Sequence, residues 1–144
     1  MSIQENEGIL VSDVMMDLNR VPIIQENAIL KKALEEMGLI NLGIVCIVDS
    51  KFKLLGILTD GDIRRKLLSV QKPFSAFFVD DALDHSIRNP LTIRPSETLL
   101  HAVNVMGGKK IWDLPVVDSD GVLMGLLHLH PVVKKLLNVN FDNR

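Results

Sequence analysis

The sequence predicts an α+β fold of two tandem β-α-β-β-α repeats related by pseudo-two-fold symmetry, because the chain repeats its own pattern. The same apolar run, acidic turn and glycine occur twice, and 69 residues separate Asp49 from Asp118 and Gly56 from Gly125. The same offset pairs further residues without a gap: Ile24 with Ile93, Leu30 with Leu99, Ala33 with Ala102 and Met37 with Met106. We therefore expect a first repeat over residues 9–70, a connector over 71–82 and a second repeat over 83–138.

A one-sided helix follows a short extended segment, residues 21–24, in the first repeat. Apolar residues recur at the i, i+3, i+4 and i+7 positions, at Leu30, Ala33, Leu34 and Met37. We expect Asn27 to cap this helix and Gly38 to end it in a left-handed conformation. In the second repeat, Ser96 is the expected cap and Gly107 with Gly108 the expected end, around an apolar stripe at Leu99, Ala102, Val103 and Met106.

The strands are predicted from apolar runs on either side of an acidic turn. Residues 44–48 form a β-branched run without alternation, which indicates a strand covered on both faces. Turns around Asp49 and Asp118 lead into returning strands over residues 54–58 and 123–127. Final helices are expected over 61–68 and 131–137, the second with Pro131 at its first helical position, where the missing amide is tolerated.

The connector is unusual because it holds three of the five phenylalanines, Phe74, Phe77 and Phe78. Elsewhere the core must be aliphatic, since apolar residues make up 47% of the chain and aromatic residues only 4%. One interpretation of the connector is a loop that its aromatic side chains anchor to the surface. The other is a contact patch for a second subunit or a neighbouring domain.

Composition excludes several classes of partner. A net charge of −2 provides no basic field for a phosphate backbone, so we expect no nucleic-acid partner. The longest apolar run, residues 44–48, is far too short to span a membrane. The single cysteine, Cys46, fits a reducing compartment, and the acidic residues 1–7 do not resemble a secretory signal. We therefore expect a cytoplasmic protein.

The repeated pattern resembles the tandem cystathionine-β-synthase (CBS) domain pair. The residues that carry the resemblance are Leu114–Asp118 and Val45–Asp49, the two strand-helix junctions at 56–65 and 125–130, and Arg88–Pro90. The two junctions are also similar to those of CBS pairs attached to arabinose-5-phosphate-type sugar-phosphate isomerases and to sugar-nucleotide transferases. The catalytic domains of those enzymes have no counterpart in these residues.

The resemblance implies a regulatory module that is not itself an enzyme. Members of the family bind adenosine nucleotides such as AMP or ATP in clefts between the repeats. It further implies a homodimer and control of an attached or partner enzyme of sugar-phosphate metabolism. The alternative is a structural oligomerisation module that binds no ligand.

The family's ligand motif, Gly-x-x-Thr/Ser-x-x-Asp, maps onto Gly56, Thr59 and Asp62 of the first repeat. A carboxylate can accept hydrogen bonds from both hydroxyls of a ribose, and a hydroxyl beside free helix amides can hold a phosphate oxygen. Ile44 and Val45 would supply apolar walls for a base. The alternative role of Thr59 is to cap the helix, and that of Asp62 is to favour the helix dipole.

The second repeat departs from the motif, because His128 replaces Thr59 and Pro131 replaces Asp62. Proline cannot accept a hydrogen bond from a ribose, so we expect one competent nucleotide site, or a second site altered for another ligand. His128 could contact a phosphate, as could Lys109 or Lys110, although the lysines also fit a solvated helix end. We expect no metal site and no cofactor, since no cluster of ligands has recognisable spacing.

Overall fold

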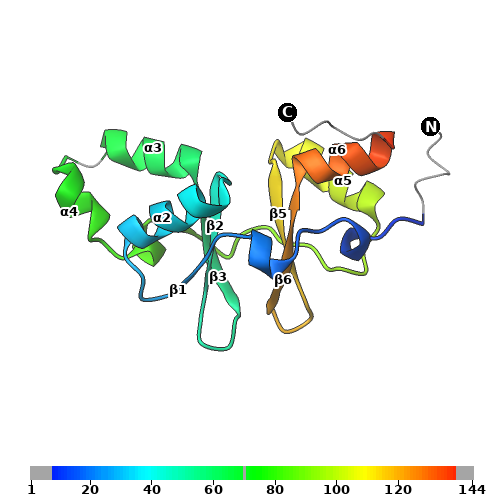
Figure 1. Cartoon of the computed structure of the whole chain (residues 1–144), viewed down its shortest axis with the longest axis horizontal. Helices are drawn as coiled ribbons and strands as arrows, with labels where there is room; N and C mark the ends of the chain where they lie inside the picture. Colours follow the sequence, from blue (N-terminus) through cyan, green and yellow to red (C-terminus); the bar gives the residue numbers. More distant parts are fainter. Residues whose placement is uncertain (1–7, 70, 139–144) are drawn as a thin grey trace. The chain divides into compact units, whose positions relative to one another are not determined.

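The computed structural model describes residues 8–69 and 71–138 of the 144-residue chain (Figure 1). The chain divides into two compact units. The repeat-1 unit contains Asn19–Pro90 and Asp120–Leu123, and the repeat-2 unit contains the residues up to Leu18, Leu91–Ser119 and the residues from Met124 onward. The acidic segment 1–7 and residue 70, the expected end of the first repeat, lie outside the described residues.

The repeat-1 unit is built on a four-stranded sheet in the order β1-β2-β3-β4. Its strands are β1 (Ile23–Gln25), β2 (Ile44–Val48), β3 (Leu54–Thr59) and β4 (Ile87–Arg88). The pair β1-β2 is parallel, and the pairs β2-β3 and β3-β4 are antiparallel. Helix α2 (Leu30–Ile40) connects β1 to β2, and α3 (Asp60–Ser69) follows β3. The β-α-β-β-α order expected for the first repeat is confirmed.

The repeat-2 unit has the same order with a reduced first strand. Its elements are α5 (Leu99–Lys109), β5 (Asp113–Val117), β6 (Leu123–His128) and α6 (Leu129–Leu137). In place of a full first strand, Ile93 makes a single parallel bridge to Val116. The segment that we expected to begin the first repeat also belongs to this unit, because a short 3-10 helix, η1 (Val11–Asp13), buries Val11 completely beside Leu99 and Leu114.

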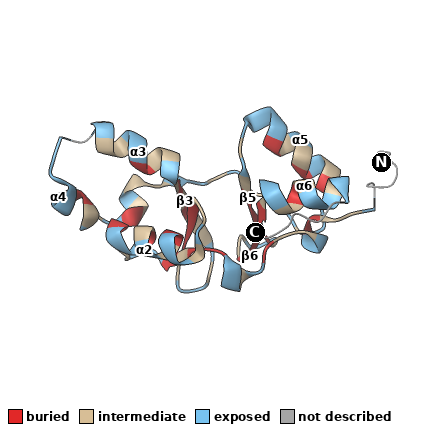
Figure 2. Ribbon diagram, turned by 45° about the horizontal axis from the view of Figure 1, so that its top comes forward, coloured by how far each residue is buried: buried red, intermediate tan, exposed pale blue. Residues whose placement is uncertain are grey.

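Each unit has its own aliphatic core, to which the central strands and one face of the longer helices contribute buried residues (Figure 2). All five residues of β2 are buried, so the predicted coverage of both faces of this strand is confirmed. In the repeat-1 unit, Leu30, Ala33 and Met37 of α2 pack on this core. In the repeat-2 unit, the equivalent residues Leu99, Ala102 and Met106 of α5 do the same. The predicted apolar stripes are therefore correct.

The predicted helix starts were wrong. Helix α2 begins at Leu30 after an N-cap at Ile29, so Asn27 lies too far upstream to cap it. Helix α5 begins at Leu99 and is capped by Thr98, not Ser96, because the Thr98 hydroxyl accepts a hydrogen bond from the His101 amide. Pro131 is the third residue of α6, not the first. Its missing amide still costs nothing there, because the first-turn amides have no partner within the helix.

The predicted helix ends were also wrong, because neither helix stops at its glycine. Gly38 lies inside α2, and the left-handed residue at its end is Asn41, whose amide donates to the Met37 carbonyl. Gly107 lies inside α5, which ends at a left-handed Lys110. Asparagine tolerates this conformation because its short polar side chain can hydrogen-bond locally. Each helix thus continues for about one turn beyond the predicted end.

The connector is more ordered than the predicted loop. It contains a short helix, α4 (Phe74–Phe78), and a 3-10 helix, η3 (Ala82–His85). Phe77 is 1% exposed and belongs to the core of the repeat-1 unit, whereas Phe74 is 64% exposed. The expected aromatic anchor is therefore Phe77. Among the described helices, none has the length and apolar character that crossing a membrane would need.

Candidate functional site

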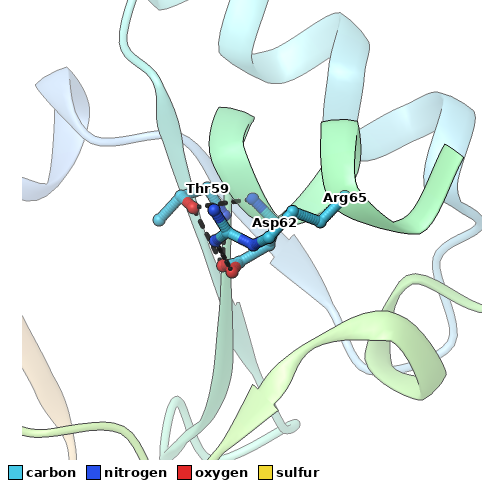
Figure 3. A network of polar contacts seen from close by, with 3 residues as sticks. All are labelled: Thr59, Asp62 and Arg65. Carbon is cyan, nitrogen blue, oxygen red and sulfur yellow. Dashed lines mark hydrogen bonds and ion pairs between the residues drawn. The ribbon is translucent and has the colours of Figure 1, made fainter. Parts of the chain in front are cut away.

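Thr59 and Asp62 lie at the junction where β3 ends and α3 begins (Figure 3). The Asp62 amide donates to Thr59 Oγ1 at 3.2 Å, and the Thr59 amide donates back to Asp62 Oδ2 at 3.2 Å. The Thr59 hydroxyl also donates to Asp62 Oδ2 at 2.9 Å. This reciprocal pattern is a capping box, with aspartate in the place usual for glutamate. The capping role considered for Thr59 is confirmed.

Arg65 completes this polar network one turn further along α3 (Figure 3). Its Nη2 lies 2.7 Å from Asp62 Oδ1, so both oxygens of the Asp62 carboxylate have partners. The Arg65 side chain is 64% exposed and that of Asp62 is 14% exposed. Because an exposed ion pair is weak, a ligand could displace the guanidinium from Oδ1 at small cost. Each carboxylate oxygen also retains capacity for a further hydrogen bond.

A pocket of about 320 Å³ opens beside Asp62 within the repeat-1 unit. It lies between α3 and the short segment that leads from η3 into β4. Its lining residues are Asp62, Arg65, Lys66, Ser69, His85, Ser86 and Ile87. The volume is at the lower end of the range for small-molecule sites. The junction that the sequence singled out is therefore the edge of a polar pocket.

The segment that leads from η3 into β4 approaches β3 so closely that position 56, the first of the motif, has room only for a glycine. A Cβ atom at Gly56 would lie 2.5 Å from Ser86 Oγ and 3.0 Å from the Ile87 carbonyl oxygen. The first distance is shorter than a Cβ atom tolerates, and the second is tighter than an ordinary van der Waals contact, to an atom of the backbone. Glycine at this position therefore allows one wall of the pocket to pair with the sheet.

Ile44 and Val45 lie on β2, opposite Thr59 and Leu58 respectively. Both side chains are fully buried, and Val45 packs in the core of the repeat-1 unit. Neither lines the pocket beside Asp62. Their expected role as apolar walls for a base stays a prediction.

In the repeat-2 unit, the position equivalent to Thr59 is part of a different interaction. His128 Nδ1 lies 2.7 Å from Asp113 Oδ1, and the side chains are 29% and 15% exposed. His128 precedes α6 as its N-cap residue without a side-chain capping bond. Burial raises the pKa of the Asp113 carboxyl above its ordinary value of 3.8, and the hydrogen bond from His128 opposes part of this rise.

Lys110 lines a pocket of the repeat-2 unit that His128 does not line. This pocket is an apolar groove of about 370 Å³ between α5 and α6. The other lining residues are Val103, Met106, Gly107, Ile111, Trp112, Leu129, Val132, Val133 and Leu136. Trp112 is 69% exposed. Over residues 8–69 and 71–138, no three His, Cys, Asp or Glu side chains are placed to hold a metal ion.

A third polar cluster, which no sequence pattern indicated, lies at the end of the connector. Asp80 Oδ2 lies 2.6 Å from Lys72 Nζ and 2.8 Å from His85 Nε2. Hydrogen bonds from Lys72 and then from His85 hold the pKa of Asp80 below its ordinary value of 3.8. The His85 ring lies 4.8 Å from that of Phe77, centroid to centroid. Lys72 and Asp80 flank α4, and His85 ends η3, so no periodic pattern joins these three residues.

The duplicated sheet-and-helix units and the polar strand-helix junction define a CBS domain pair. The family model described as the CBS domain matches residues 11–69 and 80–137, so the chain belongs to the CBS domain family.

Curated relatives include arabinose 5-phosphate isomerase KdsD of Salmonella typhi, which is 31% identical over 124 residues. The match covers 86% of this chain but 36% of the isomerase. KdsD of Escherichia coli strain K12 is 32% identical over the same share of each chain. The chain thus spans about a third of the length of these relatives.

Solved structures of CBS proteins share the fold. CBSX2, solved in complex with AMP, is 27% identical with a TM-score of 0.80, and the match covers 91% of this chain and 98% of CBSX2. A putative acetoin utilization protein, AcuB of Vibrio cholerae, is 28% identical with a TM-score of 0.76, over 90% and 91% of the two chains. The architecture is therefore that of a CBS pair.

Proposed function

We propose that this chain is a regulatory CBS pair that binds an adenosine nucleotide, such as AMP or ATP, or a related ligand. The observation that carries the proposal is the Thr59–Asp62 junction at the edge of a polar pocket, with both residues at their places in the family's ligand motif. CBSX2 in complex with AMP supports an adenosine ligand. Asp62 binds the ribose hydroxyls, and Arg65 moves aside from Oδ1.

The same proposal makes the chain a sensor and not an enzyme. Its ligand controls an attached or partner enzyme of sugar-phosphate metabolism, which the relation to arabinose 5-phosphate isomerase supports. The ligand binds one conformation of the CBS pair more tightly than another and so raises the population of that conformation. The enzyme responds to this change because it contacts the CBS pair. We further propose that the module works in the cytoplasm as a homodimer.

The proposed contact between the two copies is the apolar groove of the repeat-2 unit. Trp112 and Leu129 line this groove and are exposed there, at 69% and 37%. The equivalent groove of the repeat-1 unit has Gly43 and Asp60 at these two positions and is more polar. An exposed apolar groove of this kind is typical of an interaction surface.

A thermal-shift screen tests the nucleotide-binding proposal. The ligands are AMP, ADP, ATP, S-adenosylmethionine and a CMP-linked acidic sugar, each titrated to saturation against the full chain. A ligand at about 100 times its Kd adds about 2.7 kcal/mol to the free energy of unfolding, which raises Tm by several degrees. A shift with an adenosine ligand supports the proposal. No shift with any ligand, in a protein that remains dimeric, supports the structural oligomerisation module instead.

A further inference from the structure

The two repeats carry equivalent grooves beside their helices. The repeat-1 groove has a volume of about 490 Å³ and lies where α2 ends and α3 begins. Each residue that lines it has an equivalent, 69 residues further along the chain, among those that line the apolar groove between α5 and α6, here called the repeat-2 groove. Met37 and Gly38, for example, correspond to Met106 and Gly107. Duplication has therefore produced the same groove twice.

The two grooves carry opposite charges. Asp60 is the only charged residue that lines the repeat-1 groove, and Lys110 is the only one that lines the repeat-2 groove. Both residues are exposed. Within residues 8–69 and 71–138, neither side chain has an ion-pair partner. The repeat-1 groove thus presents one unpaired negative charge and the repeat-2 groove one unpaired positive charge.

The grooves also differ in the size of one side chain. Trp112 lines the repeat-2 groove and is 69% exposed, whereas the equivalent residue of the repeat-1 groove is Gly43. In the repeat-2 unit, the Leu129 amide donates to the Trp112 carbonyl at 2.9 Å. The Asp60 amide makes the same bond to the Gly43 carbonyl at 3.0 Å. A Cβ atom at position 43 would lie 2.7 Å from Asp60 Oδ2, so the glycine leaves room for a carboxylate where the other groove has an exposed indole.

We propose that the repeat-2 groove of one copy docks on the repeat-1 groove of a second copy, so that each repeat contacts the unlike repeat of its partner. The inference rests on the proposed function, because it takes the homodimer proposed above and names the surfaces that meet. Lys110 of one copy then pairs with Asp60 of the other. The Trp112 indole packs against the wider groove, at the end where glycine replaces it. In a dimer with two-fold symmetry this contact forms twice.

Contacts between like grooves are less favourable. Two repeat-2 grooves would bring two Lys110 side chains into an interface that has no lining carboxylate. Two repeat-1 grooves would bring two Asp60 side chains together without a lining cation. Like charges repel across an interface, and each loses water without gaining a partner. The contact between unlike grooves avoids both costs, because it contains one cation and one carboxylate.

Charge reversal tests this pairing through the Kd of the full-chain dimer, measured by sedimentation equilibrium. Asp60→Lys and Lys110→Asp should each raise the Kd by about tenfold, since each turns two attractive pairs into two repulsive ones. The double variant should return the Kd to within about threefold of wild type, because the pair is restored with its signs exchanged. Lys109→Asp reverses a neighbouring charge that does not line the groove, and this control should leave the Kd unchanged. Circular dichroism verifies that each variant is folded.

Cross-linking tests which grooves meet. Gly38 and Gly107 line the two grooves at equivalent positions, and a Cβ atom at either meets nothing within 4 Å, so cysteine can replace both. A short bismaleimide should join Gly38→Cys to Gly107→Cys in a mixture of the two chains, and should join neither variant to itself. Gly108→Cys, equally open but outside the groove lining, is the matched control for Gly107→Cys. Wild type, whose only cysteine is the buried Cys46, is the blank.

Three results would overturn the inference and leave the homodimer intact. The first is a cross-link within Gly38→Cys alone or Gly107→Cys alone, which would show that like grooves meet. The second is a dimer whose mixed variants do not cross-link. The third is a Kd that single charge reversal leaves unchanged, or that the double variant does not restore. A chain that stays monomeric at every concentration would instead contradict the proposed homodimer itself.

Discussion

His128 Nδ1 lies 2.7 Å from Asp113 Oδ1, at the two strand positions where the first repeat pairs Thr59 with Ile44. Duplication therefore gave two junctions that have since diverged. In the first, a threonine and an aspartate form a capping box that borders a polar pocket. In the second, a histidine turns toward the neighbouring strand, and Pro131 stands where an acceptor would be needed. The two repeats share a fold but not a site.

The raised pKa of Asp113 predicts a pH-dependent contribution to stability. Because the folded protein binds the Asp113 proton more tightly than the unfolded chain does, this contribution is fully present below the ordinary pKa of 3.8. It is lost as pH rises through the higher pKa of the folded state. Relative to Asp113→Asn, the wild-type free energy of unfolding should therefore fall as the pH rises above the ordinary pKa of 3.8. Urea denaturation at a series of pH values measures this difference.

The His128→Gln background is the control for this pH dependence. His128 opposes the rise in the pKa of Asp113, so its removal should make the fall steeper. A difference between wild type and Asp113→Asn that is constant with pH would contradict the account of this pair.

The connector helix predicts that truncating two phenylalanines three residues apart, Phe74 and Phe77, will destabilise the protein unequally. Phe77→Ala removes a side chain that is 1% exposed and should lower the free energy of unfolding by about 3–5 kcal/mol. Phe74→Ala removes a side chain that is 64% exposed and should change it by less than about 0.5 kcal/mol. Chemical denaturation measures both. Equal costs would mean that α4 does not pack on the core as described.

Two glycines in different packing environments should respond oppositely to alanine. Gly56→Ala places a Cβ atom against Ser86 Oγ and the Ile87 carbonyl, and should destabilise the protein by about 1–3 kcal/mol. Gly38→Ala meets nothing within 4 Å inside α2, and should stabilise it by about 0.5–1 kcal/mol. Thermal unfolding of the two variants measures both changes in stability. A loss of stability in Gly38→Ala would indicate that α2 ends at Gly38 and does not continue to Ile40.

Much of the fold could be predicted from the sequence because the repeat and the apolar periodicities are local signals. The fully buried β2 and the apolar faces of α2 and α5 follow directly from these patterns. Helix ends were missed because asparagine, lysine and glycine can all adopt the left-handed conformation. The sequence does not show that α2 continues past Gly38 and ends at the left-handed Asn41.

The polar clusters were harder to predict because they depend on contacts across the fold. Thr59 and Asp62 are three residues apart, and their capping box could be recognised from spacing. Asp113 and His128 are fifteen residues apart and meet only through the strand register. His85 lies within a segment that we expected to begin the second repeat, and its place in the pocket wall depends on the path of the chain after α4.

The central claim, that the first-repeat junction is the ligand site and its second-repeat counterpart is not, is tested by one matched pair of variants. Asp62→Asn keeps a capping acceptor but removes the second carboxylate oxygen, and Pro131→Ala alters the equivalent position. The measurement is the rise in Tm that saturating AMP produces in each variant, relative to the same variant without ligand. We expect Asp62→Asn to lose most of the rise and Pro131→Ala to keep it. A full rise in Asp62→Asn, or its loss in Pro131→Ala, would contradict the assignment of the site.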